Sequence, residues 1–590
     1  MRKFTQISKF AMFGALLLTA TGCFGPGDDP TSSPSGTTSP TSSPSEPTNP
    51  TSNPSGDPTS SPTSSPSDPT SGSKEHGTAD LHLWHNFGSE YSGDLNESLI
   101  DPLLQKDDID VKATSKGSYD KLKEAISGSI STVDYPNIAT GYPDHFADYA
   151  RSGYIPGEAD TGILVNLNKY LDDEALNEAH RQKTGYTFRQ DFYEEFMIEN
   201  NTIAYDTSDH SLTVGLPFNK STEVLGYNGI FVDYAKTIYS DLKVPSTWQE
   251  WKDLGPKFRD VQLKLNGKKL YGTQTEEGTA SNFSFEKSDS NKELLDFTEA
   301  KDEETAVLSW DSMANMFITL VRQFGAEFTS YTTADRHASK IEDQHGYMEF
   351  YSGVNRSKTV AAMQLVRDLA GTTNEDRIFA TPAFFGSGYA SDAFAKNQVM
   401  FTICSTGGLG YNINPGKQRF RVAPIPYKDA SLKYVISQGA NMTIFDRGNI
   451  DNKAQYNKQQ TLDLAFETII KMTTGDYQAK WATETGYYPA SRSATESAIY
   501  QEFINIETPD YEDAVATAYR ESAQLNQREY MSKAKKWTKF VDPGFVGSAT
   551  IRLKADNIVG AVINNIGIKS IEDILEDVYK DPQLTKFVRG

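Results

Sequence analysis

Alternating apolar and polar residues near Ala79 mark the start of the ordered part of the chain. ADLHLWHNF, from residue 79, alternates as a β-strand does, and a helical spacing follows over residues 95–104. DIDVKATS then predicts a second strand, SYDKLKEAISGSI a helix, and PNIATGY a third strand. Strands that alternate with helices in this way predict a parallel sheet with right-handed crossovers, and therefore an α/β fold.

Each of these predicted strands ends in a polar stretch that contains glycine and an aromatic residue. The three stretches are HNFGSE, TSKGSY and GYPDH. Ligands bind at the carboxyl ends of the strands in such sheets. The three loops are therefore predicted to line a binding site.

The beginning of the chain has a different pattern. Basic residues precede a short apolar run over residues 10–18, which is too short to span a membrane as a mature helix. Small residues then lead directly into Cys23. This resembles a bacterial lipobox, which implies a signal peptide over residues 1–22 and a lipid on Cys23. A plain secretory peptide with an incidental cysteine is the alternative.

A polar segment follows the predicted lipidation site. Residues 26–73 are nearly all Ser, Thr, Pro, Gly, Asn and Asp, so they have almost no apolar surface to bury against their ordering entropy. We interpret residues 23–77 as the lipidated cysteine and a disordered tether. The chain has no second long apolar segment. It is predicted to be anchored at the extracellular face of the cell membrane without spanning it.

Length, charge and cysteine content narrow the classes of protein further. The chain has 590 residues, too many for one ordinary core, and a net charge of −22. Nucleic acid is not a predicted partner, because phosphate binding needs clustered Lys and Arg. Apart from Cys23, the only cysteine is Cys404, so no internal disulfide is expected.

A series of short stretches between residue 79 and about residue 580 occurs in the order typical of one protein family. They include KGSYDKL, PNIATGYPDHFADYARSGYI, PFNKSTEVLGYNGIF, VPSTWQEWKDL, ISQGANMTIF, KWATETGYYPASRSA and IRLKADNIVGAVI. The chain resembles the bacterial extracellular solute-binding proteins of the carbohydrate type, which serve ABC importers. This resemblance implies a periplasmic-binding-protein-like fold of class II, with two α/β lobes, a hinge and a ligand in the cleft.

The resemblance also implies the boundaries of the two lobes. The first lobe would comprise residues 79–216 and 438–484, and the second lobe residues 222–436 and 487–590. Residues 265–351 contain an acidic stretch longer than the family needs, which we interpret as a surface insertion. The stretch GLPFNKST would then be the first crossing between the lobes. Its Asn219, Ser221 and Thr222 are expected to point polar groups at the cleft, while Val224 and Leu225 enter the core.

The function implied is the capture of a carbohydrate or a sugar or glycerol phosphate by lobe closure, and its delivery to the permease. Sugars present C–H faces and O–H edges, so aromatic rings and polar groups are expected in the cleft. The glycerol-3-phosphate-binding proteins have the nearest pattern within the family. Their ligand positions map onto Tyr119, Asp144 (where the family usually has Glu), Ser221, Ser405, Gly439, Tyr487 and Arg552. Further aromatic candidates are Trp84, Tyr142, Trp248, Trp310 and Tyr411.

Arg552 is the candidate that favours a phosphate-bearing ligand. A guanidinium can hold a phosphate through two parallel hydrogen bonds. A salt bridge on a helix surface is the plainer interpretation of the same residue. The ligand class therefore stays open between neutral sugars and phosphates.

Motifs for catalysis are absent from the sequence. It contains no phosphate loop, no H-E-x-x-H and no G-x-S-x-G. His82 and His85 face opposite sides of a predicted strand and would not chelate a metal together. We predict no catalytic residue, metal or cofactor, and a monomer. A lipid-anchored glycoside hydrolase, with two carboxyls about 5 Å apart, and a surface adhesin are the alternative functions.

Overall fold

The computed structural model describes most of the chain after residue 79. The described residues are 80–87, 95–103, 109–152, 161–201, 203–205, 208, 210–274, 279–336, 345–413, 419–451, 456–506 and 514–589. The predicted signal peptide, Cys23 and the tether lie outside them. All elements below belong to the unit Glu75–Gly590. Among the helices that are described, none has the length and apolar character needed to cross a bilayer.

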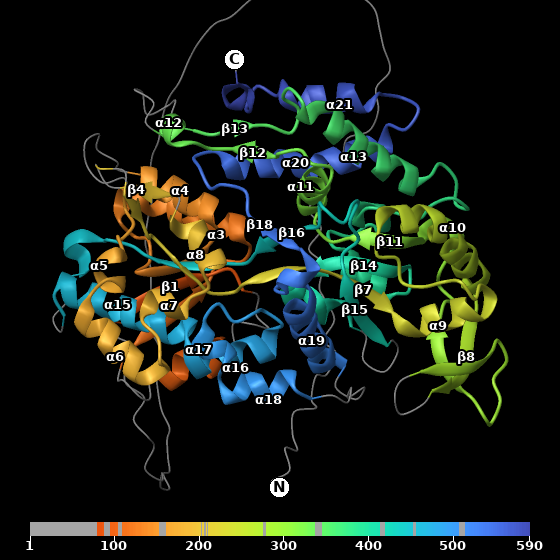
Figure 1. Ribbon diagram of the computed structural model, residues 1–590, viewed down its shortest axis with the longest axis horizontal. Helices are drawn as coiled ribbons and strands as arrows, with labels where there is room; N and C mark the ends of the chain where they lie inside the picture. Colours follow the sequence, from red (N-terminus) through yellow and green to blue (C-terminus); the bar gives the residue numbers. More distant parts are fainter. Residues whose placement is uncertain are drawn as a thin grey trace, which may run out of the picture. The chain divides into compact units, whose positions relative to one another are not determined.

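In the described part of the chain, the first sheet has five strands in the order β2-β1-β3-β17-β6; β1 is labelled in Figure 1. Its three N-terminal strands are parallel, and the other two join in antiparallel register. The strands are β1 (Leu81–His85), β2 (Val111–Ser115), β3 (Ile138–Gly141), β6 (Leu216–Pro217) and β17 (Asn441–Ile444). α3 (Tyr119–Ser129) connects β2 to β3. The predicted alternation of strands and helices is therefore confirmed at the start of this sheet.

The second sheet is built around the longest of its described strands, β7 (Ser221–Asn228). β14 pairs with one edge of β7, and both β15 and β16 pair with the other. The remaining strands are β11 (Ala306–Trp310), β14 (Val399–Ser405), β15 (Phe420–Pro424), β16 (Tyr434–Gln438) and β18 (Thr538–Phe540). We call each sheet with its covering helices a lobe.

Helices cover both sheets. Those with the first sheet or next to it are α4 (Pro143–Arg151), α5 (Asn168–Leu171), α6 (Glu174–Thr184), α7 (Phe188–Asp191), α8 (Glu194–Asn201), α15 (Lys458–Thr473), α16 (Gly475–Thr485), α17 (Arg492–Thr495) and α18 (Ala498–Ile504). Those with the second are α9 (Gly229–Ile238), α10 (Trp248–Leu265), α11 (Met313–Gln323), α12 (Thr333–Arg336), α13 (Asn355–Ala370), α14 (Ala390–Ala395), α19 (Ala514–Leu525), α20 (Ser548–Asn564) and α21 (Ile571–Tyr579).

Several short or separate strands complete the described structure. β8 (Lys269–Gln274), β9 (Ala280–Ser284) and β10 (Lys292–Asp296) form a three-stranded antiparallel sheet. β4 (Ala204–Tyr205) pairs with β5 (Ser211–Leu212), and β12 (Thr329–Ser330) with β13 (Tyr347–Met348). The predicted insertion over 265–351 thus contains a small sheet, but also β11 and the buried α11 of the second lobe.

Each lobe has its own apolar core. Leu81, Leu83 and Ile138 from the first sheet pack with helix residues in one cluster. The second cluster includes Val224 and Leu225 of β7, as expected from the sequence, together with most of α11. These cores consist of the alternate apolar residues of the strands and the regularly spaced apolar residues of the helices.

The chain passes from the first sheet to the second between Pro217 and Ser221, and it returns between Gln438 and Asn441. The two crossings run side by side, because the backbone N–H groups of Phe218 and Asn219 donate to the carbonyl of Ala440 at 3.1 and 2.9 Å. Gly439 has a φ of +108°, and a Cβ there would lie 1.6 Å from the Asn219 carbonyl oxygen. Only glycine fits at this point of the paired crossings.

Two polar residues of the first crossing do not behave as the sequence suggested. Asn219 is buried, and its Oδ1 accepts a hydrogen bond from Trp481 Nε1 at 2.7 Å. Thr222 Oγ1 donates to the Ile436 carbonyl at 2.7 Å. The expectation that both point at the cleft is wrong, because backbone and indole groups of the packed crossing need these hydrogen bonds.

Candidate functional site

Elements of both lobes enclose a cavity. The start of α4 and the inner end of α8 line it from the first lobe, and β16, the residues after β18 and α20 line it from the second. Its lining includes Tyr142, Asp144, Glu199, Gly439 and Arg552. The volume is about 80 Å³, whereas small-molecule sites commonly have about 300–1,000 Å³. A sugar would therefore enter only if the two lobes moved apart.

Three tyrosines from distant segments lie together near this cavity. The Tyr119 and Tyr142 rings are 4.4 Å apart between centroids. Burial raises the pKa of Tyr119 well above its ordinary value, and the nearby Tyr142 and Tyr487 raise it further. Burial also raises the pKa of Tyr142, to about 12. The Tyr119 and Tyr142 hydroxyls therefore stay neutral near pH 7 and can donate hydrogen bonds.

Local structure positions each of these tyrosines. Tyr119 is the first residue of α3, whose N-cap Ser118 accepts a hydrogen bond from the Lys121 backbone N–H at 3.3 Å. The Tyr487 ring packs over Gly407, where a Cβ would lie 2.5 Å from the ring. Gly407 belongs to the 3₁₀ helix Thr406–Asn412, which starts directly after the predicted ligand residue Ser405. Ser405 and Tyr487 therefore both lie next to the start of this short helix.

Arg552 lies at the cavity wall, half-buried on α20. Its guanidinium donates to the Asn315 side-chain oxygen. Asn315 Nδ2 donates in turn to Glu223 Oε1 and to Gln438 Oε1, both at 3.0 Å. Its partner is thus a buried amide and not a surface carboxylate, which favours a binding role over the helix-surface salt bridge.

Three carboxylates line the cavity together with Arg552, and two of them already have cationic partners. Glu199 pairs with Lys220 at 2.7 Å, and Asp542 pairs with Arg322 at 3.0 Å. Asp144, at the start of α4, accepts a hydrogen bond from the neighbouring His145 backbone N–H at 3.0 Å. The cavity therefore offers carboxylate oxygens as acceptors and one guanidinium as a donor.

The other predicted site residues lie elsewhere or contribute indirectly. Ser221 is buried on β7, opposite Gln438 of β16, which lines the cavity. Gly439 shapes the crossing and lines the cavity with its backbone. Trp84 is half-buried, with the Lys116 ammonium 3.6 Å from its ring centroid, and Tyr411 is exposed.

Trp248 and Trp310 lie in the core of the second lobe. They are 2 % and 0 % exposed, and their rings stack with centroids 6.2 Å apart. Trp248 Nε1 donates to Gln323 at 2.7 Å, and Trp310 Nε1 to Glu223 at 2.8 Å. Both indoles are enclosed by protein, so neither ring face is available for a sugar to stack on in this structure.

Sequence reasoning missed several residues that line or support the cavity. The sequence did not identify Glu199, Asn315 or Gln438 as candidates for the site. It did not identify Glu223 either, although Glu223 lies within the stretch PFNKSTEVLGYNGIF. A single carboxylate inside an otherwise uncharged strand is the signal that was available for Glu223. Burial raises the pKa of Glu223 to about 7, against the effects of Trp310, Asn315 and Arg552.

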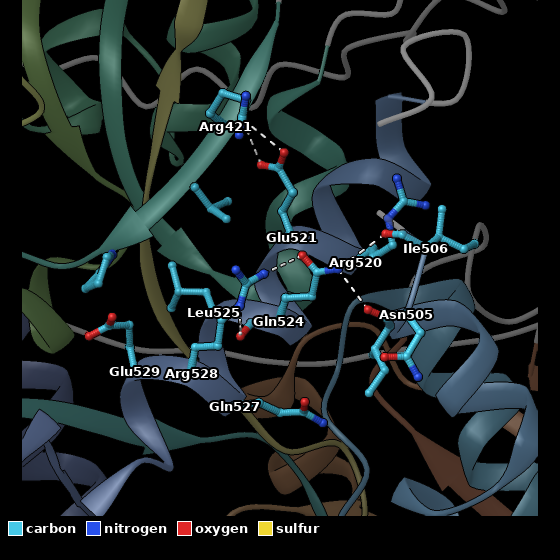
Figure 2. Close-up of a pocket in the computed structure, with 13 residues that line it drawn as sticks. Arg421, Asn505, Ile506, Arg520, Glu521, Gln524, Leu525, Gln527, Arg528 and Glu529 are labelled. Carbon is cyan, nitrogen blue, oxygen red and sulfur yellow. Dashed lines mark hydrogen bonds and ion pairs between the residues drawn. The ribbon is translucent and has the colours of Figure 1, made fainter. Parts of the chain in front are cut away.

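A larger pocket lies between β15 and α19 of the second lobe and the end of α18 (Figure 2). It has a volume of about 730 Å³ and is lined by β15, the end of α18, α19 and the residues that follow. Its charged groups already have partners: Arg421 pairs with Glu521 at 3.0 Å, and Arg528 donates to Gln524 at 2.7 Å. None of the predicted ligand residues lines it.

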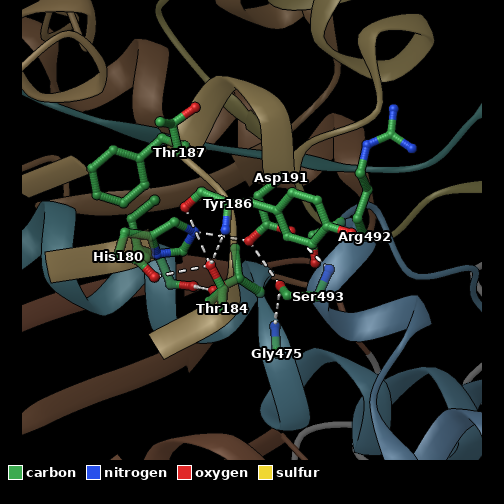
Figure 3. A network of polar contacts seen from close by, with 12 residues as sticks. His180, Thr184, Tyr186, Thr187, Asp191, Gly475, Arg492 and Ser493 are labelled. Carbon is green, nitrogen blue, oxygen red and sulfur yellow. Dashed lines mark hydrogen bonds and ion pairs between the residues drawn. The ribbon is translucent and has the colours of Figure 1, made fainter. Parts of the chain in front are cut away.

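One buried polar network superficially resembles a catalytic triad (Figure 3). His180 Nε2 lies 2.8 Å from Asp191 Oδ2, and Ser493 Oγ donates to the same oxygen at 2.7 Å. A Ser-His-Asp triad needs the histidine between the serine and the acid. Here the aspartate is in the middle, so the network ties α6, α7 and α17 together. In the described part of the chain, no cluster of three His, Cys, Asp or Glu could hold a metal.

Comparisons with known proteins agree with this architecture. A family model for bacterial extracellular solute-binding proteins matches residues 98–508, more than half of the chain. A comparison with curated proteins finds no match.

Solved structures share the fold at low sequence identity. UgpB from Mycobacterium tuberculosis, in complex with glycerophosphocholine, has a TM-score of 0.54 and 14 % identity, over 87 % of this chain and 99 % of that chain. Lmo0181 from Listeria monocytogenes, in complex with cycloalternan, has a TM-score of 0.55 and 14 % identity, over 86 % and 99 %. MalE from Bdellovibrio bacteriovorus, bound to maltotriose, has 0.51 and 14 %, over 86 % and 98 %. The chain thus has the two-lobed α/β fold of periplasmic binding proteins and belongs to the bacterial extracellular solute-binding protein family.

Proposed function

We propose that this protein is the substrate-binding component of an ABC importer, capturing a carbohydrate between its lobes and delivering it to the permease. The observation that carries the proposal is the convergence of Tyr119, Tyr142 and Tyr487 beside a cavity lined from both lobes. Three structural neighbours are complexes with glycerophosphocholine, cycloalternan and maltotriose, which supports a small polyhydroxylated ligand.

The chemistry of the cavity suits a sugar. Aromatic rings stack on C–H faces, and neutral phenols donate to hydroxyl oxygens. Carboxylates such as Asp144 and Glu199 accept hydrogen bonds from hydroxyl groups. Because three carboxylates and a single guanidinium line the cavity, a neutral or singly charged ligand fits it better than a dianion.

A phosphate-bearing ligand is the second candidate, and Arg552 favours it. A half-buried guanidinium at the wall of the cavity can bind a phosphate or phosphodiester oxygen. Ser405 would supply a neutral donor to the same group. A glycerol phosphodiester combines one negative charge with a small polyol and is the form of this ligand that we favour.

Calorimetry on single variants separates the two candidates. With maltotriose, Tyr119→Ala should weaken binding by about 2 kcal/mol, while Arg552→Ala changes little. With glycerophosphocholine or glycerol 3-phosphate, Arg552→Ala should lose about 2–5 kcal/mol, and Arg552→Lys should recover part of that loss. Arg528→Ala, which changes an arginine of the pocket in Figure 2, is the matched control. Binding of maltotriose that survives loss of both Tyr119 and Tyr487 would contradict the sugar site.

The same experiment tests the enzymatic alternative. A binding protein returns maltotriose unchanged after prolonged incubation, whereas a lipid-anchored glycoside hydrolase releases shorter sugars. Native mass spectrometry of freshly purified protein would reveal a retained ligand and identify its mass. Steady release of glucose or maltose by the purified protein would overturn the proposal.

A further inference from the structure

Behind Arg552, a buried network of side chains leads to a single carboxylate. Glu223 lies in the middle of β7 and is 1 % exposed. Its Oε1 accepts hydrogen bonds from Trp310 Nε1 at 2.8 Å and from Asn315 Nδ2 at 3.0 Å. Asn315 then presents its own oxygen to the Arg552 guanidinium. Glu223 and Arg552 are thus connected through one amide.

The orientation of the Asn315 amide follows from its partners. Its nitrogen donates to two acceptors, Glu223 Oε1 and Gln438 Oε1. Its oxygen therefore faces Arg552, which has only donors to offer. Glu223 is therefore one of the two acceptors that hold this amide in the orientation that Arg552 uses.

We propose that Glu223 is a specificity-determining residue that balances the charge of Arg552 through Asn315, so that its own charge decides between a neutral sugar and an anionic ligand. The inference rests on the proposed function, because it concerns the same cavity. An ionised Glu223 opposes an anion at Arg552, whereas a protonated Glu223 leaves the guanidinium uncompensated.

The network allows Glu223 to change its charge without being dismantled. Both donors reach Oε1, and Oε2 has no hydrogen-bond partner among the described residues. A proton can therefore bind Oε2 while both hydrogen bonds persist. Burial raises the pKa of Glu223 to about 7, so both forms are populated near neutral pH.

Other titratable groups face Glu223 from neighbouring elements. Arg552 on α20 lowers its pKa, and Asp311, after β11, raises it. The pKa of Asp311 is itself raised to about 7 by burial, so Asp311 titrates in the same range. Cys404 on β14 and Tyr530, before β18, both have pKa values raised well above normal by burial, and both stay neutral. Asp311 is therefore the group to control for.

A titration of the Trp310 indole tests the coupling without any ligand. The chain has six tryptophans, so few indole N–H signals appear in a nitrogen-15 spectrum of the full chain, and Trp310→Phe assigns the one required. This signal should titrate near pH 7 in the wild type and in Asp311→Asn, but not in Glu223→Gln. In Arg552→Gln the midpoint should move to higher pH, because a positive charge that favours the carboxylate is lost.

The remote acid Glu349, which pairs with Arg589, provides the matched control: Glu349→Gln should leave the midpoint in place. An Arg552→Gln midpoint equal to that of the wild type would show that the two charges are independent and would overturn the inference. So would a Trp310 signal that follows Asp311 instead of Glu223.

Binding measurements at pH 6 and pH 8 test the consequence for specificity. At pH 8, Glu223→Gln should bind glycerol 3-phosphate on the order of tenfold more tightly than the wild type, and maltotriose equally well. At pH 6 the gain should shrink, because the wild-type carboxyl is then largely protonated. An equal change for both ligands would overturn the role in specificity. If the wild type binds neither probe but the titration couples Glu223 to Arg552, the proposed ligand class fails and the charge pair stands.

Discussion

At the scale of single residues, burial changes how readily acidic side chains ionise. Glu223 and Asp311 both have pKa values of about 7 because burial disfavours their charged forms. Lys220 and Glu199, by contrast, form an ion pair at 2.7 Å with side chains only 0 % and 2 % exposed. Burial without an ion-pair partner is what raises the pKa of Glu223 and of Asp311.

Stability should therefore depend on pH through Glu223. Its pKa lies at about 7 in the folded protein and near 4.5 ordinarily, so between these values the folded state binds a proton that the unfolded state has lost. The free energy of unfolding should fall as pH rises from about 4.5 to about 7, by roughly 3 kcal/mol from this group. Denaturant titrations of wild type and Glu223→Gln at pH 5 and pH 8 measure the difference. A mutant with the same pH dependence as the wild type would refute this prediction.

At the scale of elements, α8 and the two crossings act together. Lys220, in the first crossing, donates to Glu199 of α8 and, at 3.4 Å, to the Gly439 carbonyl of the second crossing. Glu199 Oε1 also accepts a hydrogen bond from the Ser437 hydroxyl at 3.3 Å. At the other end of α8, Glu195 pairs with Lys539 of β18 at 3.2 Å. One helix of the first lobe thus holds two lysines at the junction with the second.

Breaking the ion pair at the crossings should be costly. Lys220→Met leaves Glu199 charged and buried, so the free energy of unfolding should fall by about 3–5 kcal/mol. The double variant Lys220→Met with Glu199→Leu should recover most of this loss, because no buried charge remains. Urea titration measures both. Lys301→Met, which removes an exposed pair with Glu304, is the control and should have no measurable effect. A double variant as unstable as the single one would contradict the argument.

At the scale of the whole molecule, the cavity of about 80 Å³ between the two lobes would have to enlarge to admit a sugar. Two of the chain segments that link the lobes are the short crossings at residues 217–221 and 438–441, and backbone rotation there could separate two sheets that stay rigid. On the proposed function, opening would admit the ligand, and contacts made from both sides would favour the closed form. Micromolar binding, about −8 kcal/mol, would suit this mechanism.

Ligand should make the protein more compact in solution. Small-angle scattering with and without saturating maltotriose or glycerophosphocholine should show a smaller radius of gyration in the complex, because closure brings the lobes together. The Tyr119→Ala variant, at a ligand concentration below its own higher dissociation constant, should keep the larger radius of gyration. Equal radii at proven saturation would indicate a rigid cleft.

Membrane attachment is a separate prediction about the whole chain. The small residues before Cys23 and the tether that follows it predict a lipid anchor. Cys23→Ala should move the protein from the membrane fraction to the soluble fraction, as measured by fractionation and immunoblotting. Cys404→Ala is the control, since that thiol is buried in the second lobe. Cys23→Ala protein that remains on membranes would point to another anchor.

Local patterns in the sequence were sufficient for the first elements and for the family. The alternation in LHLWH, the helical spacing after SYD and the succession of short motifs all act over a few residues, where periodicity and propensity are decisive. They predicted the first strands and α3 as the structure has them. They also led to Tyr119, Tyr487 and Arg552 as candidates through the resemblance, before any geometry was known.

Only the tertiary structure decided which side chains are buried and which distant residues they contact. Trp248 and Trp310 are residues of the kind that stack on sugars, but they lie in the core. Asn219 and Thr222 form hydrogen bonds within the packed crossings. Arg552 and Asn315 are 237 positions apart, so no local pattern could pair them. Whether a polar side chain binds a ligand or serves the fold depends on which distant segment is packed against it, and a periodic pattern contains no information about that segment.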